Sequence, residues 1–181
     1  MMLKEKETNT KRHFYIEEVI LILLLVLSLL GTRTTDYSPV DGYGYWIIMV
    51  FVFALLAITI ACLQSKHRIT DFKKILYEQS LHWLTSLLVV EGVFSLQKTD
   101  HLTQENAGLV IMMILAQSTI LDGLRVGWRF SLVGIFLGVS AIIAANTHHF
   151  FWIEIIIALL IVTVTILVEV WQRKKARKTQ L

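Results

Sequence analysis

Residues 77–97 read YEQSLHWLTSLLVVEGVFSLQ, an apolar stretch that is long enough to cross a membrane yet carries Glu78, His82 and Glu91. A helix needs roughly 20 apolar residues to cross a hydrocarbon core of about 30 Å. Ionisable side chains are costly at that depth, so they need protein partners, water or protonation. The stretch therefore predicts a membrane-spanning helix that carries a polar site.

Five further apolar stretches occupy most of the remaining chain, at residues 14–32, 46–64, 107–124, 130–145 and 151–171. We therefore expect an all-α polytopic membrane protein, in which residues 14–171 form a bundle of six transmembrane helices with short loops. Residues 1–13 and 172–181 are expected to be polar tails, the second of them basic. Only 17% of the residues are charged, whereas a soluble domain usually has about a quarter.

The distribution of basic residues predicts the orientation of the bundle. Of the 17 Lys and Arg residues, 15 fall in segments that six spans would place on one side, namely 1–13, 65–76, 125–129 and 172–181. Loops rich in Lys and Arg remain in the cytoplasm. We therefore expect both termini to be cytoplasmic, and the short loops favour a bacterial inner (plasma) membrane as the location.

The ionisable residues of 77–97 divide between two sites. Glu78 and His82 are four residues apart and share one helix face near the cytoplasmic end. Glu91 lies on nearly the opposite face and about 20 Å higher. For Glu78 the simplest interpretation is an interfacial carboxylate, and for His82 a hydrogen bond to a neighbouring helix. Glu91 is expected to be enclosed, so it is the main candidate for an ion or proton site.

The span at 107–124 adds two further polar residues. Asp122 and Arg125 are three residues apart, at the turn into the next span. This pair predicts an interfacial salt bridge, and the alternative is a cytoplasmic gate or a proton relay from His82 through Asp122. Gln117 lies deeper in the same span and could bridge two helices by hydrogen bonds.

A second polar cluster is expected at the outer surface, where His148 and His149 precede Glu154. Imidazole and carboxylate groups together can bind a divalent metal or sense external pH. Adjacent histidines on a turn are more often exposed to solvent, and the spacing matches no recognised metal motif. No cofactor is therefore predicted, and whether a metal binds stays open.

Small residues follow one stripe of the span at 130–145, with spacings of four, three and four residues: Gly134, Gly138, Ala141 and Ala145. Such a stripe lets two helix backbones approach closely. It predicts packing inside the bundle or, alternatively, the interface of a homo-oligomer.

Two functions from different classes remain open. A buried carboxylate favours a transporter or channel for protons, cations or a small solute, whereas the short loops are also typical of a non-catalytic scaffold subunit. No phosphate loop, GxSxG, HExxH or CxxC motif occurs, so the sequence gives an enzyme no support. The expected partners are the lipid bilayer and a second copy or another membrane protein, but not nucleic acid.

Overall fold

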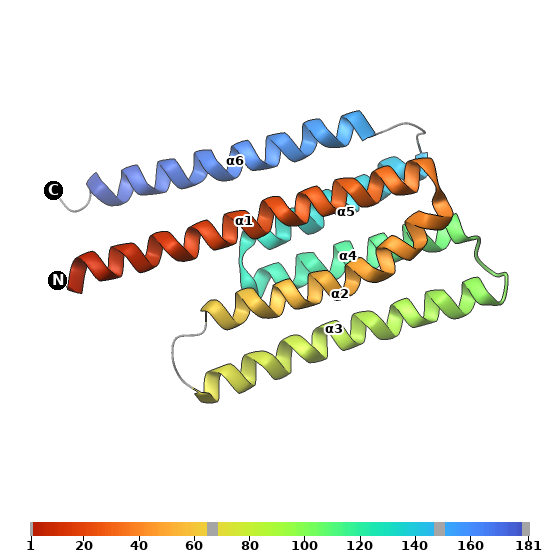
Figure 1. Cartoon of the computed structure of the whole chain (residues 1–181), viewed down its shortest axis with the longest axis horizontal. Coiled ribbons are helices and arrows are strands. Elements are labelled where there is room, and N and C mark those ends of the chain that lie inside the picture. The colour runs from red at the N-terminus through yellow and green to blue at the C-terminus, as the bar shows by residue number, and fades with distance from the viewer. Residues whose placement is uncertain (1, 65–68, 147–150, 179–181) are drawn as a thin grey trace.

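The computed structural model describes residues 2–64, 69–146 and 151–178, and within them all regular secondary structure is helical. Six helices follow one another along the chain (Figure 1): α1 (Met2–Tyr37), α2 (Pro39–Gln64), α3 (Ile69–Lys98), α4 (Gln104–Val126), α5 (Trp128–Asn146) and α6 (Phe151–Lys178). The expected all-α architecture is confirmed. Long apolar helices suit a membrane because they satisfy their own backbone hydrogen bonds.

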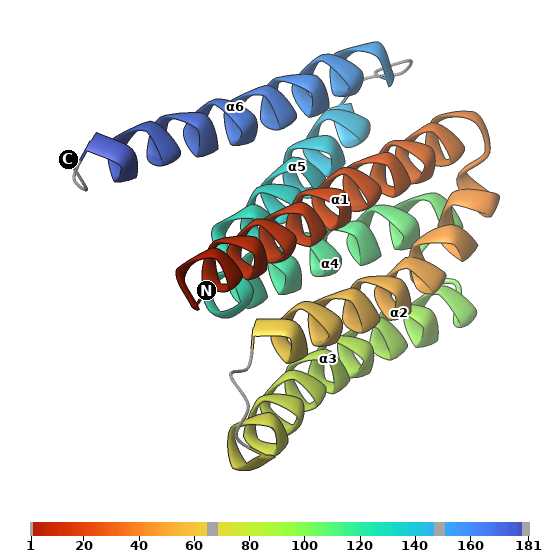
Figure 2. The same cartoon turned by 60° about the vertical axis from the view of Figure 1, so that its left-hand side comes forward.

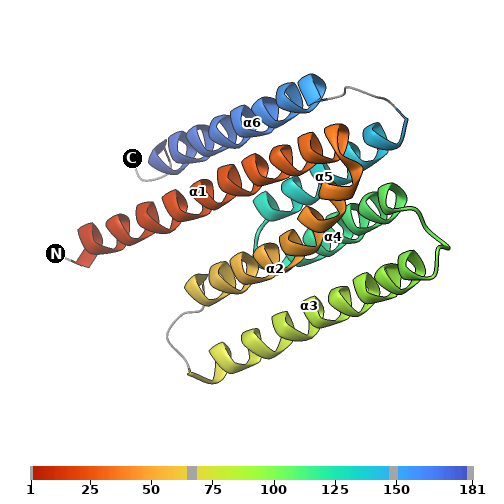
Figure 3. The ribbon, with the colours of Figure 1, turned by 45° about the vertical axis from the view of Figure 1, so that its right-hand side comes forward.

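The six helices run alternately up and down one bundle, with α3 and α6 at opposite edges (Figures 1 and 2). The start of α1 and the end of α6 lie at the same end, which we call the terminal end (Figures 1 and 3). The α4–α5 turn also lies at the terminal end. The α1–α2 and α3–α4 connections lie at the other, distal end.

Helix α4 forms the centre of the bundle, since it packs against α2, α3 and α5, whereas α6 rests on α1 and α5. Over their most apolar segments, 56% of the α4 residues are buried but only 17% of the α6 residues. The outer faces are largely apolar, as Leu88, Leu124 and Trp152 illustrate with 74%, 78% and 74% exposure. Such a surface is compatible with membrane integration and is unusual for a protein surrounded by water.

Five helices are long and apolar enough to cross a membrane, over the segments Glu18–Thr35, Asp41–Cys62, Gln104–Val126, Trp128–Asn146 and Phe151–Val168. Five of the six expected spans thus correspond to helices of sufficient length and hydropathy, and the number of spans stays a prediction. Helix α3 falls short because Glu78, His82 and Glu91 lower the mean hydropathy of its apolar segment.

The spans expected at 14–32 and 46–64 leave residues 33–45 as their connection, but the structure makes most of this connection helical. Helix α1 continues to Tyr37 and α2 begins at Pro39, so Ser38 alone separates them. The hairpin is closed by side chains, because Trp46 donates its indole N–H to Thr35 at 2.9 Å and Tyr45 donates its hydroxyl to the Leu27 carbonyl at 2.6 Å. Helix α1 also extends to Met2, so most of the expected N-terminal tail is helical.

The turn between α4 and α5 is also a single residue long, and it depends on glycine. Gly127 has a φ of 147°, a backbone conformation that side chains with a Cβ rarely adopt. Its N–H donates to the Gly123 carbonyl at 2.9 Å and its own carbonyl accepts from the Phe130 N–H at 2.9 Å. This reversal brings α5 directly back along α4 and fixes the position of Asp122 beside it.

Candidate functional site

A row of polar side chains lies between α3 and α4, near the terminal end. We call it the polar seam, and its members are Gln79, His82, Trp83 and Ser86 of α3 with Ser118 and Asp122 of α4. Most of these side chains are buried, and His82 is partly so. The α3 members recur at spacings of three and four, which places them on one helix face turned toward α4.

Asp122 is the acidic member of the polar seam, and its side chain is only 1% exposed. The Trp83 indole N–H donates to Asp122 Oδ2 at 3.2 Å. Gln79 lies beside the same carboxylate, and His82 and Arg125 are close enough to act on it electrostatically. Asp122 Oδ1 and Gln79 Oε1 are both buried without a hydrogen-bond partner.

His82 and the two serines extend the polar seam toward the middle of the bundle. His82 Nε2 lies 3.0 Å from the Ser118 carbonyl oxygen, and since a carbonyl can only accept, Nε2 is the donor. The hydroxyl groups of Ser86 and Ser118 are 2.7 Å apart, and Ser86 also donates to the His82 carbonyl at 3.1 Å. Beyond Ser118 the interface becomes apolar, at Leu115, Ile111, Val90 and Val93.

The structure brings together two of the five residues expected at the ion or proton site, His82 and Asp122. Glu78 is exposed and forms a long 3.9 Å ion pair with Lys74, one turn earlier on α3. Gln117 is exposed on α4, one residue away from the face that meets α3. Neither of them therefore belongs to the polar seam.

Glu91 does not occupy the enclosed position expected for it. Its side chain is exposed on the outside of α3, and Gly92 beside it faces open space. The buried face of α3 passes through Ser86, Val90 and Val93, and Glu91 lies well to one side of that line. Glu91 is near Tyr43 of α2, whose hydroxyl is buried without a hydrogen-bond partner.

The outer polar cluster can be described only in part. Glu154 lies in the first turn of α6 and is fully buried. His148 and His149 lie outside the described residues. Within residues 2–64, 69–146 and 151–178, no three His, Cys, Asp or Glu side chains gather as metal ligands would.

The small-residue stripe of α5 lies partly against α4. A Cβ added at Gly134 would come within 2.7 Å of the Ile120 backbone nitrogen, and one at Gly138 within 3.7 Å of the Ala116 side chain. Ala141 is buried, whereas Ala145 is exposed near the end of α5. Three of the four stripe residues are thus used inside the bundle.

A second buried polar group, the Glu18 cluster, joins three helices near the terminal end. Glu18 of α1 accepts a hydrogen bond from Thr165 of α6 at 3.3 Å and lies 3.5 Å from Arg129 Nε of α5. The side chains of Glu18 and Arg129 are only 12% and 11% exposed. No local sequence pattern points to this cluster, because Glu18 and Thr165 are 147 residues apart.

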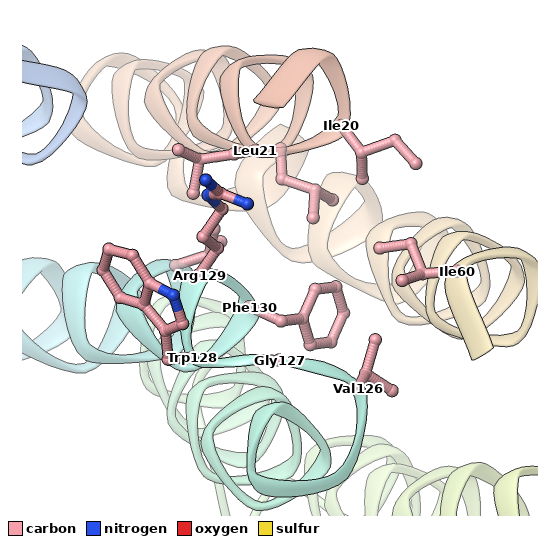
Figure 4. Close-up of a pocket in the computed structure, with 10 residues that line it drawn as sticks. Ile20, Leu21, Ile60, Val126, Gly127, Trp128, Arg129 and Phe130 are labelled. Carbon is pink, nitrogen blue, oxygen red and sulfur yellow. The ribbon is translucent and has the colours of Figure 1, made fainter. Parts of the chain in front are cut away.

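A half-open pocket of about 350 Å³ adjoins the Glu18 cluster. Figure 4 shows Arg129 reaching from the start of α5 toward α1, while Phe130, Val126 and Ile60 line the opposite part. The lining is apolar except for Arg129 and the turn backbone, and the Arg129 guanidinium lies 5.6 Å from the Trp128 ring. Since Arg129 is already paired with Glu18, its charge is not free to attract an anion into this pocket.

The sequence predicted part of the polar seam but missed Gln79, Trp83 and Ser118. A usable signal existed in the spacing of Gln79, Trp83 and Ser86, which repeats the helical period of the buried face.

Searches against protein-family models, curated proteins and solved structures give no match to this chain.

Proposed function

We propose that this protein is a small integral membrane transporter that moves protons, a cation or a small solute by means of Asp122. The observation that carries the proposal is a fully buried carboxylate hydrogen-bonded into a polar row inside a bundle with an apolar outer surface. Ionisable groups within such bundles are costly and are typical of substrate, ion and proton pathways. Glu91, the carboxylate that the sequence favoured, does not carry this proposal because it is exposed.

The proposal includes a transmembrane placement of α3. Helix α3 packs against both α2 and α4 and runs antiparallel to them (Figure 3). If α2 and α4 cross the membrane, the chain can join them only by crossing back along α3. The inward-facing polar groups of α3 would then be shielded from lipid by α4, which explains how a helix of lower hydropathy is tolerated.

The terminal end is assigned to the cytoplasm in this proposal. The described helix ends that adjoin the segments with 15 of the 17 Lys and Arg residues lie at this end, in agreement with the rule that basic loops stay inside. The polar seam then opens toward the cytoplasm. At about 1.5 Å per residue, Ser118 lies roughly 12 Å along α4 from Val126, so the polar row reaches into the inner half of the bilayer.

The apolar contacts beyond Ser118 would act as the barrier of such a transporter. Leu115, Ile111, Val90 and Val93 are all at most 6% exposed, and they close the α3–α4 interface toward the distal end. Transport would require these two helices to separate there while the terminal end closes. The α4–α5 pair, locked by the Gly127 turn, would move as one unit.

The test is flux through liposomes that contain the purified protein, measured with pH-sensitive and cation-sensitive dyes under an imposed gradient. Asp122→Asn keeps the shape and the acceptor for Trp83 but cannot exchange a proton. We expect it to lower the flux by about tenfold or more, which corresponds to about 1.4 kcal/mol of barrier per tenfold. Glu91→Gln is the matched control and should leave the flux unchanged. An Asp122→Asn protein that folds and transports normally would contradict the proposal.

A scaffold role is the second candidate, and the outer face of α3 favours it. Glu91, Gly92 and Ser95 are exposed there, and an ionisable group facing lipid is costly unless a partner helix covers it. The small-residue stripe of α5 no longer supports this role, since α4 covers most of it. No flux in any of the assays, together with a stable complex above the monomer mass in native mass spectrometry, would favour the scaffold over the transporter.

A further inference from the structure

We infer that the polar seam binds a proton rather than a metal cation, and that this proton sits on Asp122 and is shared with Gln79. The inference deepens the proposed transport function and rests on it for its biological role. Its physical basis is separate, because it depends on which buried atoms have hydrogen-bond partners.

Two buried oxygen atoms at the polar seam lack a hydrogen-bond partner. Asp122 Oδ1 and Gln79 Oε1 are acceptors without a hydrogen-bond donor, although their side chains are only 1% and 3% exposed. Asp122 Oδ2 already accepts from Trp83. Buried polar groups nearly always have partners in folded proteins, so each of these two oxygens calls for a hydrogen-bond donor.

A single proton supplies that donor. A protonated Asp122 has one O–H group, which can donate from Oδ1 to Gln79 Oε1, and both acceptors are then satisfied. The Gln79 amide already acts on the carboxylate as a hydrogen-bond donor, so the two side chains are adjacent and no rearrangement of the helices is needed. The charge that burial would penalise disappears at the same time.

A metal cation fits this site less well. Hard cations such as Ca²⁺ take six to eight oxygen ligands and Mg²⁺ takes six. The polar seam offers the two free oxygens of Asp122 and Gln79, since Trp83 occupies Oδ2 and His82 occupies the Ser118 carbonyl. Two ligands are enough to share a proton but not to replace the hydration shell of a cation.

The surrounding charges leave His82 as the group that can exchange this proton. Among the described residues, α3 brings His82 and the more distant Glu78, α4 brings Arg125, and α5 brings Arg129 at its first turn. The titratable residues Asp41, Tyr43 and Tyr45 of α2 lie toward the distal end, and Cys62 lies at the terminal end. His82 Nε2 donates to Ser118, so Nδ1 is free to accept the proton that leaves Asp122 Oδ1. The transfer leaves a carboxylate and an imidazolium, whose opposite charges stabilise each other.

Infrared spectroscopy of the protein in liposomes tests the inference directly. The chain has five Asp residues, so labelling aspartate with carbon-13 separates their carboxyl bands from those of glutamate. The other four, Asp36, Asp41, Asp71 and Asp100, lie near helix ends or in a turn. We expect one carboxylic-acid carbonyl band from aspartate at neutral pH that shifts in deuterated water and disappears in Asp122→Asn.

Gln79→Leu provides the second variant, because it removes the acceptor but leaves Asp122 in place. The acid band should then move to higher frequency, as expected for a carboxylic acid that has lost its hydrogen-bond acceptor. An aspartate spectrum with carboxylate bands alone at neutral pH would overturn the inference and indicate an ionised Asp122 with a bound water or cation. An unshifted acid band in Gln79→Leu would exclude Gln79 as the partner.

The outcome is independent of the flux assay. A protein that shows the acid band but transports nothing would retain the proton site and disprove the transporter. A protein that transports in an Asp122-dependent way without the acid band would retain the transporter and disprove the proton site.

Discussion

At the scale of single residues, the environment of each carboxylate differs more than its place in the sequence suggests. Glu91 is surrounded by apolar residues in the chain, yet it is exposed in the fold. Asp122 is close to the end of α4, where the sequence suggested an interfacial salt bridge, yet it is almost fully buried. Helical periodicity says which residues share a face, but it does not say which face meets another helix. Which face of each helix meets its neighbours therefore decides that Glu91 is exposed and Asp122 is buried.

The Glu18 cluster gives a prediction at this scale. Because the Glu18 and Arg129 side chains are nearly buried, removing one charge leaves the other poorly compensated. We expect Glu18→Gln and Arg129→Gln each to destabilise the fold, and the double variant to lose less than the sum. The coupling energy should be about 1–3 kcal/mol, measured by unfolding in mixed detergent micelles.

The exposed pair of Lys74 and Glu78 is the matched control for that cycle. Its side chains are 75% and 47% exposed and its atoms are 3.9 Å apart, so solvent screens the attraction. The same cycle at this pair should give no measurable coupling. Equal coupling at both pairs would mean that burial does not strengthen the Glu18 contact.

At the scale of helices, the α4–α5 hairpin is the part of the fold held together most closely. A Cβ added at Gly123 would come within 2.3 Å of the Ser131 backbone nitrogen, and Ser131 also donates its hydroxyl to the Ile120 carbonyl at 3.1 Å. Close backbone approach of this kind gives van der Waals contact and weak polar contacts, which drive helix association in lipid. The stripe of small residues in the sequence was therefore a good predictor of helix packing, although not of which helix would be the partner.

A pair of glycine substitutions tests this packing. Gly134→Ala places a methyl group within 2.8 Å of the α4 backbone, so we expect a loss of about 1–3 kcal/mol in the free energy of unfolding. Gly92→Ala is the control, since an added Cβ there meets nothing within 4 Å. It should leave stability unchanged or slightly raised, because alanine favours a helix more than glycine does. Equal effects of both variants in a detergent unfolding titration would contradict this account of the hairpin.

At the scale of the whole molecule, the direction of the chain through the bundle determines which residues can reach which side of a membrane. The described helices place the start of α1, the α4–α5 turn and the end of α6 at one end (Figure 1). Helix α3, at one edge, is the element whose membrane placement decides between five and six spans.

Cysteine labelling in intact cells tests the placement. Cys62 is the only cysteine, so a Cys62→Ser background gives a protein with no reactive thiol of its own. With α3 as a sixth span, Asp100→Cys should react with a membrane-impermeant maleimide from outside. Lys74→Cys and Thr8→Cys should react only after the cells are opened. Labelling of Lys74→Cys and Asp100→Cys from the same side would show that α3 does not cross the membrane.

The sequence by itself determined the all-helical class of the fold and the six helices of the described residues. In lipid, the backbone of an apolar stretch of about 20 residues satisfies its hydrogen bonds by forming a helix. The basic residues gather at the ends of these stretches. Local patterns carry that information because each helix satisfies its own hydrogen bonds. Even helix lengths were only partly determined, since α1 extends into the polar tail and across the expected loop.

Only the tertiary structure decided which polar groups meet. The polar seam joins residues of α3 to Ser118 and Asp122 of α4, and the Glu18 cluster joins α1, α5 and α6. These meetings depend on the rotation of each helix about its own axis, which is set by how glycine and bulky side chains fit against neighbours. No single helix contains that information, because it arises when the surfaces of several helices pack together.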